Sequence, residues 1–178
     1  MDAKINQLLS KLTRSERAQL QEMDSPFKIQ QFLDSIPYSA EERNRTCIEV
    51  LREKQAHCLD GGLFAAAALW NIGYEPLIVD MQPEEGKDDD HVLAIFQEFN
   101  CWGAVAKSNY SGLRFREPVY ATIRELVLSY FEDFFNIHRE KTLRAYTLPI
   151  YLRKFDDWNW MTEESGINKI EQYLKHAE

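Results

Sequence analysis

One stretch constrains the fold more than any other: residues 55–70, with the sequence QAHCLDGGLFAAAALW. Alanine and leucine are strong helix formers, and the run of four alanines gives a narrow helix that packs closely against its neighbours. Asp60 falls in the first turn, where a carboxylate complements the positive end of the helix dipole. Gly61 and Gly62 each weaken a helix by up to about 1 kcal/mol relative to alanine. Their presence predicts that another group approaches the backbone of a central helix that opens on Cys58.

The position of Cys58 favours a reactive thiol. It lies at or just before the first helical residue, where unpaired backbone N–H groups point towards the sulfur. Such a position lowers the pKa of a thiol and favours the nucleophilic thiolate. A cysteine beside an alanine-rich run is also commonly a small, buried core side chain. Position alone leaves both roles open.

Length and net charge limit the classes of protein to which the chain can belong. The chain has 178 residues, of which 44% are hydrophobic and 28% are charged, as in ordinary globular proteins. This length suits one well-packed domain. We expect a single domain over residues 1–178, made of a helical part (1–54), a catalytic core (55–110) and a completion of the core (111–178). The net charge of −8, with no dominant basic patch, argues against nucleic acids and membrane surfaces as partners.

The remaining compositional features predict a cytoplasmic protein. No apolar run is long enough to span a membrane, and the first residues lack the apolar core of a signal peptide. Three widely spaced cysteines make no disulfide framework and are normal for a reducing compartment. The sequence predicts no cofactor and makes no prediction of the oligomeric state.

Apolar periodicity predicts helices on both sides of a small sheet, that is, an α+β fold. The first fifty residues are expected to be helical, with capping boxes at Thr13–Glu16 and Ser39–Glu42 and a helix start at Ser25–Pro26. The expected later elements are strands over 75–81, 90–96 and 101–106, a helix over 118–136, a strand over 142–148 and a helix over 167–174. Gly73 should end the central helix in a left-handed conformation. The short connection at 97–100 predicts an antiparallel hairpin.

His91 is the candidate base for Cys58. It begins the second predicted strand, directly after a polar loop, and imidazole titrates in the range that a thiol nucleophile needs. The base needs an Asp, Asn or carbonyl acceptor to fix its tautomer. Ser108 and Asn109 lie in the loop that the hairpin returns towards His91, and Asn109 is preferred because its amide oxygen is the better acceptor. Gln55 is a candidate oxyanion donor beside the Cys58 N–H.

The segment Ala56–Asp60, opening an alanine-rich helix, resembles the nucleophile segment of the transglutaminase-like superfamily of papain-type cysteine enzymes. The elements that follow come in the order of that core, and the resemblance covers roughly residues 29–109. Residues 102–110 and 113–120 look like an uncharacterised bacterial branch. The resemblance implies a nucleophile helix packed against an antiparallel sheet, with Cys58 as nucleophile and His91 as its base.

One departure from this pattern concerns the third catalytic residue. The superfamily usually places an aspartate a few residues after the hairpin tryptophan, at about the position of Ala106, where this chain continues Lys107-Ser108-Asn109. Either Asn109 supplies the third member, as asparagine does in papain-like enzymes, or the triad is incomplete. The expected activity is acyl transfer or hydrolysis on a peptide or protein amide, including a glutamine side chain. The alternative is a non-catalytic protein-interaction module on a degenerate fold of the same kind.

The candidate site has two groups of residues: the catalytic residues Cys58, His91 and Asn109, and the oxyanion or substrate residues Gln55, Gly61, Trp102 and Ser108. Three weaker alternatives use the same region. His57 is a possible base, although neighbouring residues at a helix start diverge. A zinc site is a second alternative, with candidate ligands His57, Cys58, Asp88–Asp90 and His91. A redox-sensing thiol at Cys58 is the third.

Two further groups have a plainer interpretation. Cys47 lies in a predicted helix interior and is expected in the core, whereas Cys101 has no evident partner. Lys107, Arg114 and Arg116 follow the hairpin and could bind an acidic substrate group. Exposure for solubility is the simpler role for these three cations.

Overall fold

The computed structural model describes residues 2–177. Met1 and Glu178, the two ends of the predicted domain, lie outside the described residues. The chain begins with a helical part. Its helices are α1 (Ala3–Lys11), α2 (Arg14–Glu22), α3 (Pro26–Ser35) and α4 (Cys47–Glu53), followed by the central helix α5 (Cys58–Asn71). The capping box at Thr13–Glu16 is present, and Ser25 caps α3 with proline in its first turn. These predicted helix starts are confirmed.

The helix predicted from Ser39 is wrong in its start. Helix α4 begins at Cys47, and its capping box is Thr46–Glu49. The preceding segment is held by distant partners: the Arg45 N–H donates to Oδ1 of Asp60 at 2.7 Å, and Asn44 donates at 2.8 Å to the side chain of Asn168 in the C-terminal helix α7 (Glu164–Leu174). These tertiary hydrogen bonds outweigh the local capping signal at Ser39.

The sheet is antiparallel throughout. Its strands are β1 (Leu77–Pro83), β2 (His91–Glu98), β3 (Cys101–Val105), β4 (Arg116–Tyr120) and β5 (Leu143–Tyr146), in the order β4-β3-β2-β1-β5, with β6 (Ile150–Tyr151) also paired to β1. Phe99 and Asn100 take positive φ values of 50° and 63° in the turn between β2 and β3. Gly73 closes α5 with a φ of 103°. The predicted hairpin and helix stop are confirmed.

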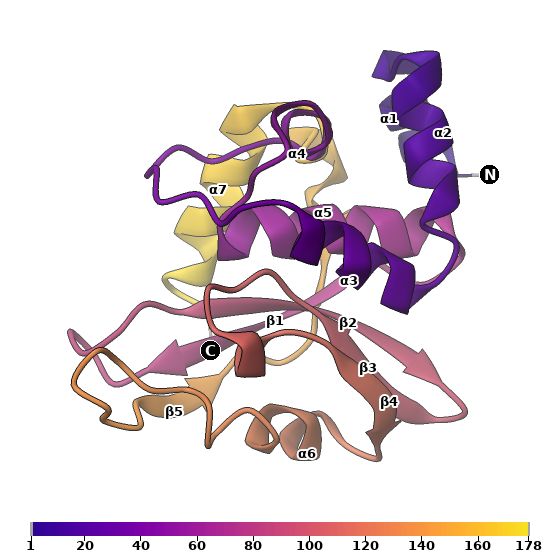
Figure 1. The fold of residues 1–178 in the computed structure, drawn as a ribbon. Helices are drawn as coiled ribbons and strands as arrows, with labels where there is room; N and C mark the ends of the chain where they lie inside the picture. The colour runs from indigo at the N-terminus through magenta and orange to yellow at the C-terminus, as the bar shows by residue number, and fades with distance from the viewer. Residues whose placement is uncertain (1, 178) are drawn as a thin grey trace.

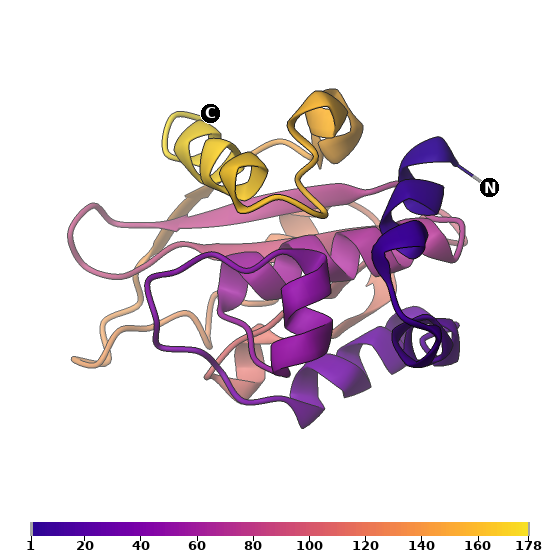
Figure 2. The ribbon, with the colours of Figure 1, turned by 90° about the horizontal axis from the view of Figure 1, so that it is seen from above.

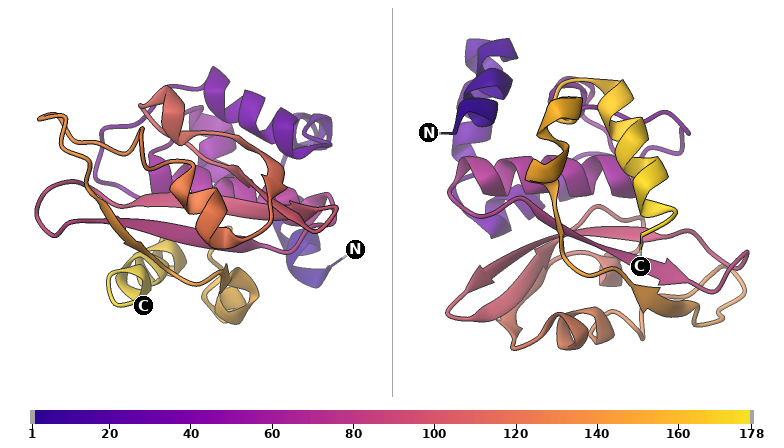
Figure 3. Two further views of the ribbon diagram at one scale, coloured as in Figure 1. Left: turned by 90° about the horizontal axis from the view of Figure 1, so that it is seen from below. Right: turned by 180° about the vertical axis from the view of Figure 1, so that it is seen from behind.

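Helices cover the two faces of the sheet unequally (Figure 1). Helix α5 lies along one face, and α1–α4 and α7 (Glu164–Leu174) are on the same side; Figure 2 shows these helices from above. The short helix α6 (Ile123–Leu128) covers the opposite face (Figure 3). Side chains of β2 alternate between two apolar clusters: Val92 and Ala94 pack towards α5, while Leu93 and Ile95 pack towards α6. The predicted α+β class, with the nucleophile helix packed against an antiparallel sheet, is confirmed.

The helix predicted over residues 118–136 is wrong for most of its length. Residues 116–120 form the edge strand β4, where Pro118 is tolerated because an edge position need not donate to a neighbour. Only Ile123–Leu128 is helical, and turns follow. The aromatic residues of this segment nevertheless enter the core as predicted, because Tyr130 and Phe134 are buried against the sheet.

The last part of the chain follows the prediction more closely. Strands β5 and β6 flank Pro149, a short 3₁₀ helix covers Leu152–Trp158, and α7 occupies the predicted C-terminal helix position. Within residues 2–177, none of the helices combines the length and the apolar composition required to cross a bilayer.

Candidate active site

The start of α5 is pressed against the sheet, as its two glycines predict. A Cβ atom on Gly61 would lie 2.2 Å from Cβ of Lys107, and one on Gly62 would lie 2.7 Å from Cγ1 of Val92. Both distances are too short for any side chain. The predicted close approach is confirmed, and the group that fills the space over Gly61 is the protein's own Lys107.

Lys107 is buried, so its interpretation as an exposed cation is wrong. Only 3% of its surface is accessible. Its ammonium group donates to the carbonyl oxygens of Leu33 at 2.7 Å and Ile36 at 2.5 Å, at the C-terminal end of α3. Burial lowers the pKa of Lys107, and the carbonyl groups at the helix end favour its positive charge. Lys107 therefore ties α3 to the strand end beside α5.

The N-terminus of α5 is fixed by a buried polar network. His57 is the N-cap, and Asp60 accepts hydrogen bonds from the backbone N–H groups of Arg45 at 2.7 Å and His57 at 3.4 Å. The His57 ring also lies 3.2 Å from Oδ1 of Asp60. Burial raises the pKa of Asp60 to about 7, although these N–H groups and the Arg45 charge oppose the rise. His57 is thus engaged in capping the helix that presents Cys58.

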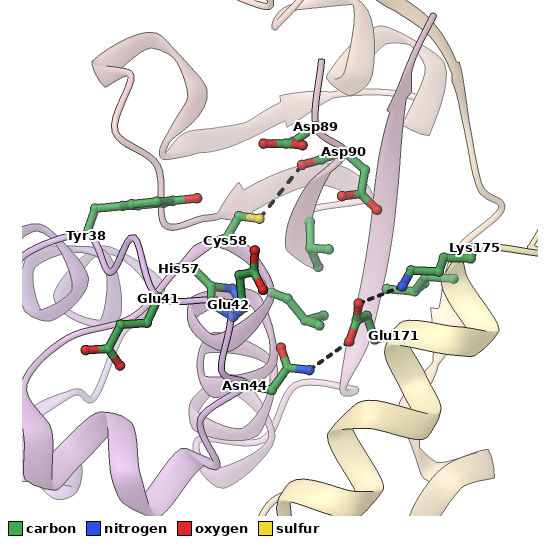
Figure 4. A pocket seen from close by; sticks show the side chains of 13 residues that line it. Tyr38, Glu41, Glu42, Asn44, His57, Cys58, Asp89, Asp90, Glu171 and Lys175 are labelled. Carbon is green, nitrogen blue, oxygen red and sulfur yellow. Dashed lines mark hydrogen bonds and ion pairs between the residues drawn. The ribbon is translucent and has the colours of Figure 1, made fainter. Parts of the chain in front are cut away.

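Cys58 occupies the first helical position, as predicted, and its thiol is half-buried. The Sγ atom donates to the backbone oxygen of Asp90 at 3.8 Å (Figure 4). Burial raises the pKa of Cys58 to about 12, and the negative charge of Asp90 adds to the rise. The prediction of a lowered thiol pKa is therefore wrong: the contribution of the helix N-terminus is outweighed by desolvation and by a neighbouring carboxylate.

Tyr38 is a neighbour of Cys58 that residue type alone did not reveal. It forms a parallel bridge with Ala56, and the adjacent Ser39 N–H donates to the Ala56 oxygen at 3.0 Å. These contacts bring the Tyr38 ring alongside the thiol, and burial together with the Cys58 charge raises the pKa of Tyr38. No motif marks this residue, because it reaches the site from the connection after α3.

His91 begins β2 and is 5% exposed. Its Nε2 atom lies 2.8 Å from the backbone oxygen of Leu113. A carbonyl oxygen only accepts, so Nε2 carries the hydrogen, and the neutral ring offers Nδ1 as its acceptor nitrogen. Burial lowers the pKa of His91 to about 4. The imidazole is therefore neutral at physiological pH and held in one tautomer.

The loop that supplies the Leu113 carbonyl is itself well anchored. It contains the 3₁₀ turn Ser111–Leu113. The Tyr130 hydroxyl donates to the Arg114 oxygen at 2.7 Å, and the Arg116 guanidinium donates to the Gly112 oxygen at 2.8 Å. Arg116 also lies over the Tyr130 ring, 4.0 Å from its centroid. These contacts hold the backbone that orients His91.

Two cavities meet at Cys58. The first, of about 430 Å³, we call the acidic cavity; it is lined by the carboxylates Glu41, Glu42, Asp89, Asp90 and Glu171, with Asn44, His57 and Lys175 among the other residues (Figure 4). The second, of about 320 Å³, we call the aromatic cavity; it is lined by Tyr110, Leu113, Phe134, Phe135 and Ile137, with Lys87, Asp88, His91 and Asn109 among the charged and polar residues. Tyr38, Cys58, Asp89 and Asp90 belong to both walls.

Four of the predicted site residues share the aromatic cavity: Cys58, His91, Ser108 and Asn109. Among residues 2–177, no hydrogen bond joins Cys58 to His91, or Asn109 to the imidazole. Ser108 is buried and accepts from the Tyr110 N–H at 3.0 Å, whereas Asn109 is exposed. The catalytic roles of these residues stay predictions, and the structure adds the Leu113 carbonyl as a competing partner for His91.

Gln55 and Trp102 line neither cavity. The Gln55 amide is 3.5 Å from the Glu53 carboxylate. Trp102 pairs with Gln97, six residues along β2 from His91, which corresponds to about 20 Å. Their predicted contacts with the oxyanion or substrate have no counterpart among the cavity-lining residues and stay predictions.

Ala106, at the position expected for a catalytic aspartate, lies in the protein core. Ala106 is buried, and its backbone N–H and oxygen are both bonded to the Gln30 side chain, at 3.0 Å each. Cys47 is buried as predicted. Within residues 2–177, no group of three His, Cys, Asp or Glu side chains is arranged to hold a metal ion.

The high thiol pKa leads to a first prediction, on alkylation by iodoacetamide. At pH 7 a thiol with a pKa near 12 has a thiolate fraction of about 10⁻⁵, against about 3 × 10⁻² for a free thiol. After allowing for the greater nucleophilicity of the more basic thiolate, we expect Cys58 to react about 100-fold more slowly than a model peptide thiol. Mass spectrometry of each cysteine between pH 6 and 10 measures this rate.

The shape of the alkylation profile is a second readout. The Cys58 rate should rise about tenfold per pH unit without a plateau up to pH 10, and His91→Ala should leave it unchanged because the ring is already neutral. A plateau below pH 8 that disappears in His91→Ala would contradict the prediction and indicate a thiolate–imidazolium pair.

The chain shows only limited similarity to known proteins. No family model matches the chain, and no curated protein matches it. Among solved structures, LapG of Legionella pneumophila is similar over 91% of this chain and 96% of its own, with 11% identity and a TM-score of 0.49. The EGTA-treated form of Legionella pneumophila LapG is similar over 94% of this chain and 96% of its own, with 10% identity and a TM-score of 0.47. At these values the likeness identifies neither a family nor an activity.

Proposed function

We propose that the protein is a cysteine enzyme that acts on an amide bond of a polypeptide, with the Cys58 thiol as nucleophile and His91 as general base. One observation carries this proposal. The Cys58 sulfur lies at the junction of two cavities, 3.8 Å from the backbone oxygen of Asp90, the residue directly before His91. The resemblance of Ala56–Asp60 to the nucleophile segment of transglutaminase-like enzymes supports the same assignment.

The reaction follows from the protonation states of the two groups. Sγ of Cys58 forms a bond to the amide carbon while its proton passes to Nδ1 of His91. That proton then moves to the leaving nitrogen as the C–N bond breaks, giving a thioester and a free amine. Water or a second amine attacks the thioester, giving up a proton to His91 that returns to the thiol. Because the thiol and the imidazole are both neutral, proton transfer accompanies the attack of the sulfur and no thiolate–imidazolium pair forms beforehand.

We assign the orientation of the base to the Leu113 carbonyl. It accepts from Nε2 of His91, which is the hydrogen bond that an aspartate or asparagine makes in a catalytic triad. A backbone carbonyl can fix the tautomer, but it carries no full charge to stabilise an imidazolium ion. The presence of a carbonyl in place of a carboxylate accords with the low pKa of His91, since no negative charge offsets the cost of burying a charged ring.

The thiol and the imidazole must approach one another during the reaction. In the structure the thiol points to the Asp90 oxygen, and both residues line the aromatic cavity. The proposal therefore requires the Cys58 side chain to rotate from the Asp90 oxygen towards that cavity and Nδ1 of His91. Catalytic hydrogen bonds are commonly long without substrate and shorten in the complex.

Trapping of the acyl-enzyme tests the proposal. After incubation with a peptide pool that includes glutamine-containing peptides, quenching in acid and mass spectrometry should find an acyl adduct on Cys58. Cys58→Ser should lose both the adduct and turnover. Cys101→Ser is the matched control, because Cys101 is also half-buried but lies on β3 outside both cavities. Turnover that survives in Cys58→Ser would refute the proposal.

The interaction-module alternative is favoured by one observation: the expected aspartate position is closed at Ala106, and no hydrogen bond joins Cys58 to His91 within residues 2–177. Such a module would bind a polypeptide at the same cavities without forming an adduct. Peptide binding that is equal in wild type and Cys58→Ser, with no adduct in the wild type, would support this alternative.

A further inference from the structure

We propose that the substrate is an extended polypeptide segment that crosses Cys58, with a lysine or arginine side chain in the acidic cavity and a bulky apolar side chain in the aromatic cavity. This inference rests on the proposed function for the reacting bond and deepens it by naming the class of substrate. It is argued from the two cavities, from their different chemistry and from the residues they share.

The two cavities adjoin at the thiol. Tyr38, Cys58, Asp89 and Asp90 line both, so a chain that occupies the two cavities would pass over these four residues and the sulfur. Volumes of about 430 and 320 Å³ each accommodate a large side chain with part of its backbone. An extended chain advances by about 3.3–3.6 Å per residue. Residues on either side of the scissile amide would therefore reach the two cavities while the amide lies over Cys58.

The acidic cavity has an excess of negative charge. Two of its carboxylates are already paired: Glu41 with Arg45 at 2.5 Å, and Glu171 with Lys175 at 2.8 Å. For Glu42, Asp89 and Asp90, the described residues include no cationic partner within ion-pair distance. A lysine or arginine side chain from a substrate would supply it.

The position of these charges relative to the thiol gives a second reason for a cationic occupant. Burial and, after it, the charge of Asp89 raise the pKa of Asp90, and the charge of Asp90 adds to the larger effect of burial on the pKa of Cys58. A bound cation would offset this negative potential. The same contact that selects a basic substrate would then make the thiol easier to deprotonate once the substrate is in place.

The aromatic cavity presents apolar surface to water. Ile137 is 86% exposed and Tyr110 is 40% exposed at its rim. The rings of Tyr110 and Phe135 pack edge to face, with centroids 5.6 Å apart, and form one wall. An apolar substrate side chain would cover these groups and shield His91 from water, which favours a neutral base.

Binding to Cys58→Ser tests the inference separately from catalysis. The probes are fluorescein-labelled nine-residue peptides that carry a lysine and a phenylalanine separated by two, three or four glycines or alanines. Matched peptides replace the lysine by glutamate or the phenylalanine by glycine. For at least one spacing, fluorescence anisotropy should show the lysine–phenylalanine peptide binding about tenfold or more tightly than either matched peptide.

Charge reversal in the protein provides the control. Glu42→Lys combined with Asp89→Lys should remove the preference for lysine over glutamate. Glu22→Lys combined with Asp157→Lys makes the same change in net charge at exposed positions outside both cavities, and should leave the preference unchanged. Ile137→Ser should weaken binding of the phenylalanine peptide, whereas Leu148→Ser, also highly exposed but outside the cavities, should not.

The outcomes separate this inference from the proposed function. Equal affinities for the lysine and glutamate peptides at every spacing, or equal effects of the two charge-reversed proteins, would overturn the inference. Tight, lysine-selective binding without an acyl adduct in the wild type would support the inference and overturn the proposed catalysis. An adduct on Cys58 that forms equally with all peptides would support the proposed catalysis and overturn the inference about the substrate.

Discussion

Replacing His91 by alanine is expected to lower kcat on a peptide substrate by about 10²–10⁴-fold, because a positioned general base contributes about that factor. KM should change little, since the ring is 5% exposed and offers little surface to a substrate. Addition of free imidazole should restore part of the activity. His138→Ala is the matched control, because His138 is an exposed histidine that lines neither cavity.

The pH profile distinguishes a base from a structural residue. With a pKa near 4, the His91 ring is neutral above about pH 5, so kcat/KM of the wild type should be independent of the ring's protonation there and should fall as pH drops through 4. The residual activity of His91→Ala should lack this fall. His91→Gln keeps a side-chain N–H for the Leu113 carbonyl but has no basic nitrogen. If His91→Gln retains the full kcat, the ring only supports the loop and another group is the base.

Local sequence signals predicted the elements that form largely by local interactions. The alanine run of α5, the capping box at Thr13 and the hairpin after β2 depend on residues close in the chain, and all are present. The box at Ser39 failed because Arg45 bonds to Asp60 and Asn44 bonds to α7. The apolar spacing of residues 118–136 matched a helix, but the first part of that segment pairs with β3.

The same division applies to the site. The order of the elements was enough to place Cys58 and His91 on one cavity. The partner of His91 could not be predicted, because the Leu113 carbonyl is a backbone group that every residue type carries. The thiol pKa could not be predicted either, since it depends on burial and on how close Asp90 comes once β2 is packed against α5. Residue type indicates which groups can react, and tertiary packing decides their protonation.

The second large effect is expected from Arg45, whose side chain is fully buried at the start of α5. It donates to Glu53 at 2.8 Å and to Ser39 at 3.0 Å, pairs with Glu41, and lies 3.9 Å from the buried carboxylate of Asp60. Removing one partner of a buried ion pair costs about 3–5 kcal/mol. Arg45→Met should therefore lower the free energy of unfolding by about that amount, measured by urea denaturation with the m-value compared to detect a changed unfolded state.

The cost of Arg45→Met should also depend on pH, because the Arg45 charge holds down the pKa of Asp60, which burial raises from 3.8 to about 7. In the wild type, the contribution of Asp60 to stability falls as pH rises from about 4 to 7, since the unfolded carboxyl has lost its proton while the folded one retains it. Without Arg45 the folded pKa rises further and this loss continues above pH 7. The difference between wild type and Arg45→Met should thus be larger at pH 8 than at pH 5.

Arg43→Met is the control for this prediction. Arg43 also pairs with Glu53, at 2.7 Å, but its side chain is 42% exposed, so its removal should cost less than about 1 kcal/mol at either pH. Because Asp60 belongs to the capping box of the helix that presents Cys58, Arg45→Met should lower turnover as well as stability, while Arg43→Met should affect neither strongly. Equal, small losses of stability in the two variants would contradict the prediction that the buried Arg45–Asp60 network stabilises the start of α5.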